Sequence, residues 1–239
     1  MLKFLIKAKQ LFLDFLFPKT CLICGKEKTY ICQDCLSLIE INERQYCPFC
    51  SPPKITLDGR TCPSCRRKKY LNGLYFSTTY DNFIIKKLIY EFKYNRLKEL
   101  SLPLSYLIIE HLLALNKNVD FSSFLLIPIP LHKSKLKERG FNQSEEITKH
   151  LAAFLNTQFL NNVLVRKRKT FNQATLNKKE REINLKNSFA CQNQHLIHNQ
   201  KIILVDDIFT TGATIEEGAK TLKKAGAKEV WGMVVAKGK

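Results

Sequence analysis

A stretch near the carboxyl end of the chain combines carboxylates, hydroxyls and a glycine in a spacing that suits a phosphorylated sugar. Residues 201–205 are the strongest signal for a buried strand in the sequence, and Asp206 and Asp207 follow directly. Backbone N–H groups and threonine hydroxyls at the start of a helix can converge on a phosphate dianion, and glycine lets the backbone approach it closely. The residues that would do so here are Thr210, Thr211, Gly212, Ala213 and Thr214.

The two carboxylates would repel a phosphate placed beside them. We therefore expect Asp206 and Asp207 to lie one sugar-length away and to accept hydrogen bonds from the 2′- and 3′-hydroxyls of a ribose. Open α/β sheets bind their ligands at the carboxyl ends of the strands, which is where these residues fall. The segment predicts a site for a ribose 5-phosphate group, in preference to an ordinary strand and turn with surface acids.

Eight of the nine cysteines form four Cys-x-x-Cys pairs near the amino end. Two thiolates three positions apart can hold one face of a metal ion, and two such pairs complete a tetrahedral site that leaves no position for water or substrate. The pattern predicts two structural Zn²⁺ ions, with redox-active dithiols or an iron–sulfur cluster as alternatives. Sites built from sequential pairs are favoured over interleaved ones. The predicted ligands are Cys21, Cys24, Cys32 and Cys35 for one ion and Cys47, Cys50, Cys62 and Cys65 for the other.

Composition and charge limit the class of protein. The 239 residues carry 39 Lys and Arg against 21 Asp and Glu, a formal net charge of +18. This excess predicts attraction to polyanions such as nucleic acid, phosphorylated metabolites or anionic lipid, although charge spread over a solvated surface would also account for it. No run of 18 apolar residues is present to span a membrane, and no secretory signal opens the sequence. Clustered thiols are then better interpreted as metal ligands than as a disulfide framework.

Three stretches differ in pattern: 1–18, 19–70 and 71–239. The first predicts a basic amphipathic helix ending at Pro18, which can pack on its own protein or touch an anionic membrane through residues 1–17. Its wide apolar face favours packing, and the two roles are compatible. The third stretch alternates expected strands with helices, as a parallel α/β sheet flanked by helices does. The expected strands are 74–80, 124–127, 163–165, 201–205 and 230–235, and the expected helices are 82–95, 102–115, 143–155 and 214–225.

Residues 202–214 resemble the signature of type I phosphoribosyltransferases, which bind 5-phosphoribosyl 1-pyrophosphate (PRPP) together with Mg²⁺. The resemblance implies that Asp206 and Asp207 bind the ribose hydroxyls and that residues 210–214 bind the 5′-phosphate. It also implies a pyrophosphate loop after an earlier strand, followed by cations at 135, 137 and 139 that would neutralise a diphosphate. The candidates for that loop are Pro130, Leu131, His132 and Lys133.

Three further blocks, within 137–143, 166–176 and 181–190, extend the likeness over almost the whole chain. Together with the paired cysteines and an amphipathic start ending in Phe-Pro, they resemble the ComF family, including its ComFC and GntX-like members. The resemblance implies a cytoplasmic competence protein that acts in DNA uptake during natural transformation. It also implies a nucleic-acid-binding or flexible loop over the PRPP site, with Arg139, Arg166, Lys167, Arg168, Lys169 and Arg181 as candidates.

Two functions follow as expectations. The first is a protein that handles incoming single-stranded DNA in the cytosol and also binds PRPP or a related phosphorylated ribose. DNA-uptake helicase or channel proteins would be its partners, at the inner face of the membrane. The second is an active phosphoribosyltransferase with an unknown acceptor. No side chain stands out as a general base, and no nucleobase-binding hood follows the last strand. Residues 90–98 mix aromatic and basic side chains, which suits stacking on bases, but core aromatics with solvated lysines explain the mixture equally well.

Overall fold

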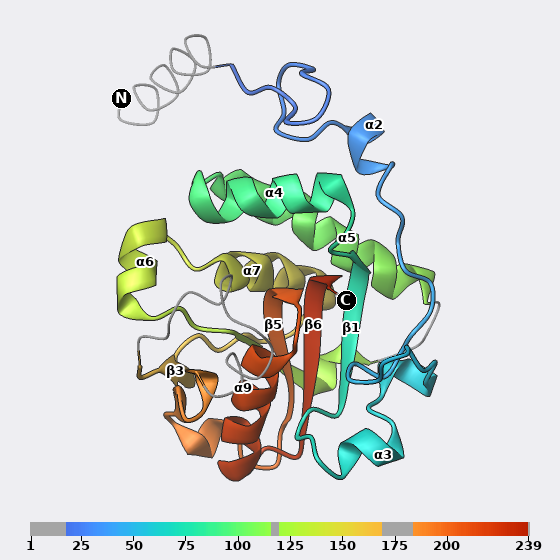
Figure 1. Cartoon of the computed structure of the whole chain (residues 1–239). Coiled ribbons are helices and arrows are strands. Elements are labelled where there is room, and N and C mark those ends of the chain that lie inside the picture. The colour runs from blue at the N-terminus through green and yellow to red at the C-terminus, as the bar shows by residue number, and fades with distance from the viewer. Residues whose placement is uncertain (1–17, 116–119, 169–183, 239) are drawn as a thin grey trace. The chain divides into compact units, whose positions relative to one another are not determined.

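The computed structural model describes residues 18–115, 120–168 and 184–238 (Figure 1). The amphipathic helix predicted over residues 1–17, and the loop candidates Lys169 and Arg181, lie outside the described residues. The chain divides into two compact units, Met1–Glu40 and Ile41–Lys239. One predicted cysteine cluster falls in each unit. The predicted boundaries at residues 18 and 70 stay predictions.

The described part of the first unit, residues 18–40, contains two of the Cys-x-x-Cys pairs. An antiparallel bridge joins Thr20 to Glu27, and Gly25 closes the turn between them with a φ of +78°. The short helix α2, Gln33–Leu36, follows. Residues 18–40 contain few apolar side chains apart from the cysteines, so the cysteines are expected to hold this stretch together.

The second unit is built on a four-stranded parallel sheet in the order β1-β6-β5-β2. Its strands are β1 (Gly73–Thr79), β2 (Phe124–Pro128), β5 (Lys201–Phe209) and β6 (Glu229–Lys237). The two central strands are nearly continuous apolar runs, because a parallel sheet is covered by helices on both faces. This arrangement confirms the predicted α/β fold class.

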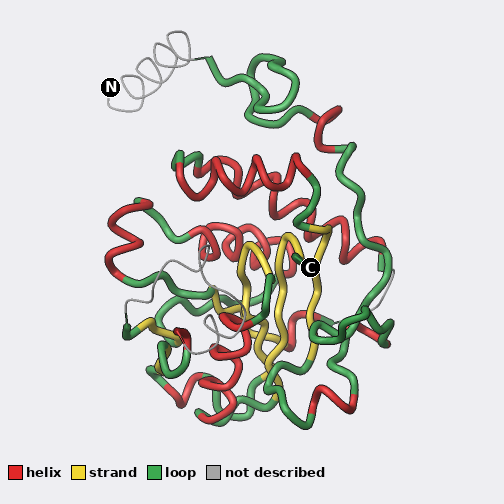
Figure 2. Tube along the Cα trace, viewed as in Figure 1, coloured by secondary structure: helices red, strands yellow, loops and turns green. Residues whose placement is uncertain are grey.

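Helices cover both faces of the sheet (Figure 2). Helix α5 (Ser101–Ala114) contacts β1 and β6, and α7 (Gln143–Leu155) contacts β2 and β5. Helix α9 (Ala213–Lys224) packs on β5 and β6 through a core that includes Ile202 and Leu204 but not Ile203. Since alternate residues of a strand point to opposite faces, α9 lies on the face opposite α5 and α7. Helix α4, Phe83–Tyr94, begins at an Asn82 cap.

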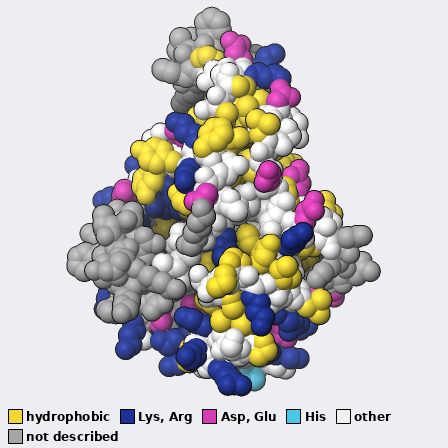
Figure 3. All heavy atoms as spheres, turned by 45° about the vertical axis from the view of Figure 1, so that its right-hand side comes forward, with side chains coloured by type: hydrophobic (Ala, Val, Ile, Leu, Met, Phe, Trp, Pro, Cys, Tyr) yellow, Lys and Arg dark blue, Asp and Glu magenta, His cyan; other side chains and the backbone are white. Residues whose placement is uncertain are grey.

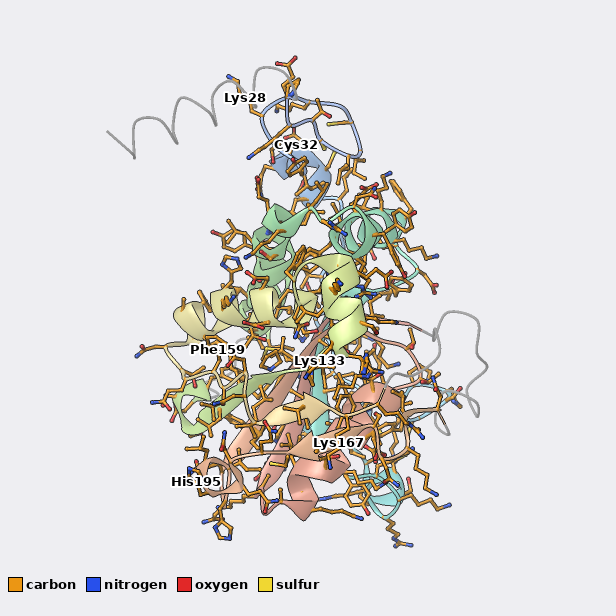
Figure 4. All side chains as sticks on the ribbon, turned by 90° about the vertical axis from the view of Figure 1, so that its left-hand side faces the viewer. Lys28, Cys32, Lys133, Phe159, Lys167 and His195 are labelled. Atoms are coloured by element: carbon orange, nitrogen blue, oxygen red, sulfur yellow. The ribbon has the colours of Figure 1, made fainter. Side chains whose placement is uncertain are left out.

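The predicted strand at 163–165 belongs to a separate small sheet. Strand β3, Leu164–Arg166, pairs antiparallel with β4, Phe189–Cys191, and with no strand of the parallel sheet. The edge of β2 is instead extended by residues 158–160, through a bridge between Leu126 and Phe159, which Figure 4 labels. The remaining described helices are α3 (Pro63–Arg66) and α6 (Lys133–Arg139), with 3₁₀ turns at Leu57–Gly59, Lys98–Leu100, Phe121–Ser123 and Gln194–Leu196.

Among the described helices, α5 is the longest at 14 residues. None of them has both the length and the apolar character needed to cross a lipid bilayer.

Candidate functional site

The acid pair lies at the carboxyl end of β5, at the edge of the sheet where ligands bind in this fold class. Asp206 Oδ1 accepts hydrogen bonds from Ser144 Oγ at 2.8 Å and from the backbone N–H of Asp207 at 2.9 Å. Asp207 Oδ2 forms an ion pair with Lys93 Nζ of α4 at 2.8 Å. The strand continues to Phe209, four residues beyond the expected end, so both acids belong to the strand itself.

The two carboxyl groups differ in their surroundings. Burial, followed by the neighbouring charge of Asp207, raises the pKa of Asp206 to about 7. Lys93 and the hydroxyl of Ser144 act in the opposite direction but do not cancel the effect. At neutral pH Asp206 is therefore poised between its acid and its carboxylate form, while Asp207 has a lysine as counter-ion.

The turn after β5 forms the predicted cradle. Gly212 has a φ of +76°, and a Cβ at this position would overlap the ring of Phe209. The backbone N–H of Ala213 donates to Thr211 Oγ1 at 3.4 Å, and α9 begins at Ala213. The N–H groups at the amino end of a twelve-residue helix carry partial positive charge and have no intrahelical acceptor. A side chain at position 212 would therefore be strained both by the backbone conformation and by the ring of Phe209.

One cavity of about 320 Å³ joins the acid pair to the cradle. Four cations also line it, and they come from three separate segments: Lys93, Lys135, Arg139 and Arg166. Asp206, Asp207 and all of residues 210–214 face this cavity, so the structure brings the core of the predicted site together. Of the other candidates, Leu131, Arg139 and Arg166 line it, whereas Pro130, His132, Lys133, Lys167 and Arg168 do not.

His132 has a local structural task. Its Nδ1 accepts the backbone N–H of Ser134 at 3.2 Å and thereby caps the amino end of α6. Lys133 is the first residue of α6, and Lys167 follows β3; both are labelled in Figure 4. The lysine of α6 that lines the cavity is Lys135 instead. Burial, and then the charges of Arg139 and Arg166, lower its pKa.

The arginines around the cavity are held by specific contacts. Arg139 Nη1 donates to Gln143 Oε1 at 3.0 Å, and its guanidinium lies 5.6 Å from the centre of the Tyr94 ring. The guanidinium of Arg166 lies 5.4 Å from the ring centre of Phe189, and burial lowers its pKa. Arg168 Nη2 donates to the carbonyl of Asn184 at 3.1 Å, so it joins the two described ends that flank residues 169–183.

Sequence reasoning missed two residues that contact the acids, Lys93 and Ser144. Both reach Asp206 or Asp207 from helices more than 60 positions away in the chain. The sequence offers no local signal for such contacts. Lys93 stands within the mixed run 90–98, and Ser144 directly follows the conspicuous Arg-Gly-Phe-Asn-Gln block, but neither pattern indicates an acid as partner.

The cysteines form two clusters in which the four sulfur atoms lie within 4.8 Å of one another. Cys24 Sγ and Cys32 Sγ are 3.6 Å apart, and Cys50 Sγ lies 3.5 Å from Cys62 Sγ. Four sulfurs bound to zinc at about 2.3 Å would be separated by about 3.8 Å along each edge of the tetrahedron. Both clusters have the donor set and spacing of structural zinc sites, and each is built from sequential pairs: Cys21, Cys24, Cys32, Cys35 and Cys47, Cys50, Cys62, Cys65.

Two protein-family models match separate parts of the chain. A double zinc ribbon domain matches residues 12–69, and a phosphoribosyl transferase domain matches residues 139–239. Among solved structures, an allosteric regulatory enzyme of purine biosynthesis shares 18% identity over 51% of this chain and 23% of its own. Its TM-score of 0.32 is too low to bear on fold or function.

Several curated proteins are similar in sequence. Competence protein F of Haemophilus influenzae is 37% identical over 114 residues, which are 46% of this chain and 50% of that protein, so the match spans half the length of that relative. DNA utilization protein YhgH of Escherichia coli is 28% identical over 84% of this chain and 88% of its own length. Competence protein ComFC of Streptococcus pneumoniae is 26% identical over 88% of this chain and 96% of its own length. A double zinc ribbon ahead of a phosphoribosyltransferase domain, together with these relatives, matches the ComF family.

Proposed function

We propose that the cavity at the end of β5 binds the ribose 5-phosphate group of PRPP or of a related phosphorylated ribose. The observation that carries the proposal is that a single cavity is lined both by the acid pair and by the whole of the cradle at residues 210–214. In this assignment Asp206 and Asp207 accept the ribose hydroxyls, and the amides and hydroxyls of Thr210, Thr211, Gly212, Ala213 and Thr214 hold the 5′-phosphate.

The cations of the cavity suit a second anionic group. Lys135, Arg139 and Arg166 all line the same cavity, and the burial and mutual charge that lower the pKa of Lys135 would be relieved by a bound anion. We assign to them the diphosphate of PRPP with its Mg²⁺. Pro130, Leu131, His132 and Lys133 form the proposed pyrophosphate loop, to which Leu131 contributes a side chain that lines the cavity and His132 the cap of α6.

The binding domain would serve a protein that handles incoming single-stranded DNA in the cytosol during natural transformation. The names of the relatives refer to competence and DNA utilization, and the formal charge of +18 favours a polyanionic partner. The proposed nucleic-acid-binding loop comprises Arg139, Arg166, Lys167, Arg168, Lys169 and Arg181. Partners among the DNA-uptake helicase or channel proteins, and contact of residues 1–17 with the inner face of the membrane, belong to the same proposal.

A second basic surface within the Ile41–Lys239 unit supports a polyanionic partner. A groove of about 410 Å³ is lined by five cations, by the half-exposed ring of Tyr70 and by Asn72. The cations are Arg66, Arg67, Lys68, Lys69 and Lys223. Lys and Arg side chains also gather along the lower part of the face drawn in Figure 3. A cationic groove with an exposed aromatic ring is the combination that single-stranded nucleic acids bind.

An active phosphoribosyltransferase is the alternative function, and one observation favours it. A carboxyl group whose pKa is raised to about 7, as for Asp206, can exchange a proton near neutral pH. Incubation with Mg²⁺-PRPP and candidate acceptors tests this alternative. Pyrophosphate release that disappears in Asp206→Ala/Asp207→Ala favours an enzyme, whereas salt-sensitive binding of oligonucleotides without turnover favours the binding role.

Titration of the protein with Mg²⁺-PRPP tests the main proposal. Thr211→Asp places a negative charge in the cradle and should abolish binding, while zinc content stays at the wild-type level. Gln192→Glu, which adds one negative charge at an exposed position away from the cavity, should bind as the wild type does. If Thr211→Asp perturbs folding, Thr211→Val removes only the hydroxyl and should weaken binding several-fold. Unchanged affinity in both Thr211 variants would contradict the proposed placement.

A further inference from the structure

Two tyrosines of α4 lie on the wall of the cavity that holds the acid pair and the cradle. The ring centres of Tyr90 and Tyr94 are 5.0 Å apart, and the ring planes are inclined at 45°. Both side chains line the cavity, and they are 54% and 48% exposed. An aromatic side chain contributes most to stability when its ring is buried, so two exposed rings at a cavity wall are poorly explained by folding alone.

The rest of α4 shows that the helix already has a core-facing side. Ile85, Leu88 and Phe92 are fully buried, and they account for the packing of the helix against the domain. Tyr90 and Tyr94 stand one helical turn apart, so they share a face of the helix. The explanation of the run 90–98 by core aromatics therefore holds for Phe92 but not for these tyrosines.

The position of Lys93 relates the tyrosines to the acids. Lys93 lies between them in the chain, and its Nζ is 2.8 Å from Asp207 Oδ2, which fixes this part of α4 against the acid pair. The cradle follows the acids in the chain, because it begins at Thr210, three residues after Asp207. The acids therefore adjoin the cradle along the chain and adjoin the tyrosine-bearing helix through an ion pair. A nucleotide has the same order of parts: phosphate, ribose, base.

The ring of Tyr94 is also held in place from the side. The guanidinium of Arg139 lies 5.6 Å from the centre of this ring, and a hydrogen bond to Gln143 anchors the arginine. A cation near an aromatic ring restricts its motion, and Arg is itself a planar surface on which bases stack. Tyr94 is thus a fixed ring, and Tyr90 stands beside it on the same wall.

We propose that Tyr90 and Tyr94 form a stacking subsite for a nucleobase, so that the cavity binds a nucleotide more tightly than a sugar phosphate alone. The inference rests on the proposed function of the same cavity, because it adds a base to the ribose 5-phosphate assigned there. Base–aromatic stacking contributes about 1–3 kcal/mol per base and accepts every base, since each has a π-face. The subsite would therefore bind nucleotides without regard to sequence.

Calorimetric titration with two probes tests the subsite. Ribose 5-phosphate reports on the cradle and the acids, and adenosine 5′-monophosphate adds only the base. The wild type should bind the nucleotide at least five-fold more tightly, as one stacked base implies. Tyr90→Leu/Tyr94→Leu should lower the affinity for the nucleotide to that for ribose 5-phosphate, which itself stays unchanged. Tyr90→Phe/Tyr94→Phe keeps the rings and should keep the preference.

Tyr106→Leu is the matched control, because this tyrosine of α5 is 48% exposed but does not line the cavity. It should leave both affinities at the wild-type level. Equal affinity of the wild type for the two probes, or an equal loss for both probes in the leucine variant, would overturn the subsite. A failure of ribose 5-phosphate to bind the wild type would instead overturn the proposed function, so the two failures are distinguishable.

Discussion

At the scale of single residues, the contrast between Asp206 and Asp207 carries the most information about the site. The two side chains contact different helices, Asp206 through Ser144 and Asp207 through Lys93. Only Asp207 has an ion-pair partner of opposite charge within 4 Å, among the described residues. Burial and the charge of Asp207 keep the pKa of Asp206 near 7, so its ionisation is coupled both to the folding and to the ligand chemistry of the domain.

We predict that Asp206→Asn stabilises the protein increasingly as the pH rises from about 4 to about 7. In the folded wild type this carboxyl keeps its proton up to about pH 7, whereas in the unfolded chain it ionises near pH 4. The folded state therefore binds more protons across this window, and raising the pH favours unfolding. The gain of the variant over the wild type should grow by at most about 1.4 kcal/mol per pH unit and level off above pH 8. Denaturant unfolding measures it.

The zinc sites also make the free energy of unfolding depend on pH, because their thiolates bind protons in acid. Subtracting the wild-type free energy from that of the variant cancels this contribution. Gln192→Glu gives the matched control, because it changes charge at an exposed position away from the acids. Its effect on the free energy of unfolding should be small and nearly independent of pH above 6. A constant difference between Asp206→Asn and the wild type from pH 5 to pH 8 would contradict the raised pKa.

A second prediction concerns Gly212. Gly212→Ala combines a φ of +76° with overlap between the new Cβ and the ring of Phe209, which is itself buried. We expect the free energy of unfolding to fall by more than about 1 kcal/mol, since a left-handed conformation alone costs about 1–2 kcal/mol in a residue with a side chain. Affinity for ribose 5-phosphate should fall at least ten-fold, measured by calorimetry.

Gly140→Ala separates backbone strain from the loss of the cradle. Gly140 has a φ of +81°, but a Cβ there would meet only the flexible side chain of Arg96, at 4.0 Å. This variant should lose comparable stability and keep its affinity for ribose 5-phosphate. If both variants lose the same affinity, the cradle has no special role.

At the scale of elements, the long and strongly patterned segments were predictable. The expected helices 82–95, 102–115 and 143–155 correspond to α4, α5 and α7, because each shows apolar residues at helical spacing. Helix α6 was not expected, since residues 133–139 contain a single apolar residue and little amphipathic pattern. The three-residue strands β3 and β4 are too short for their pairing to be visible in the sequence.

The candidate site was predictable in part for a related reason. Its cradle and acids are contiguous in sequence, so their chemistry is visible without a fold. Lys93 and Ser144 come from distant helices, and only the packing of α4 and α7 brings them to the acids. His132 has a contact that its residue type does not reveal: its Nδ1 caps the amino end of α6, while its place in the pyrophosphate loop stays a prediction.

The second cysteine cluster is linked by aromatic packing to the cradle. Phe49 lies between the ligands Cys47 and Cys50, and its ring centre is 6.0 Å from that of Phe209. Phe209 is buried, and its ring fills the space beside Gly212. Lys69 Nζ lies over the ring of Phe49, at 5.0 Å from its centre. The zinc ribbon of this unit therefore supports the turn that we assign to the phosphate.

We predict that Phe49→Ala lowers the affinity for ribose 5-phosphate three- to ten-fold without loss of zinc. Removing this ring leaves Phe209 free to move, and the cradle packs directly on Phe209. Leu57→Ala, at a position in the same unit with an exposed side chain, should change neither zinc content nor affinity. Calorimetry and metal analysis measure the two quantities. Unchanged affinity in a Phe49→Ala protein that keeps its zinc would show that the ribbon does not support the cradle.

At the scale of the whole molecule, part of the positive charge is concentrated on two surfaces of the second unit. Within the second unit, one group of cations lines the cavity with the acid pair, and another lines the groove beside α3. Glu216 accepts the backbone N–H groups of two groove residues, Tyr70 and Leu71, at 2.8 and 3.2 Å. These contacts hold the basic segment against α9.

The last prediction concerns binding of single-stranded DNA by this groove. Each phosphate contact contributes about −0.7 to the slope of log affinity against log salt for a single strand, because counterions are released. Replacing Arg66, Arg67, Lys68 and Lys223 by alanine should reduce that slope by about 2 to 3 and weaken binding of a dT₂₀ oligonucleotide at least ten-fold at 50 mM salt. Lys69 is kept because it packs on Phe49. Fluorescence anisotropy over a salt series provides the measurement.

The control removes the same number of charges elsewhere. Lys54, Lys86, Lys186 and Lys224 are exposed and line neither the cavity nor the groove. Replacing all four by alanine lowers the net charge equally, so a general attraction to polyanions would weaken equally in both proteins. If the groove is a local binding site, the groove variant should lose clearly more affinity for the oligonucleotide, and more of its salt dependence, than the control variant. Its affinity for ribose 5-phosphate should stay unchanged. Equal losses in the two proteins would mean that the charge of +18 acts as a diffuse field and that the groove has no special role.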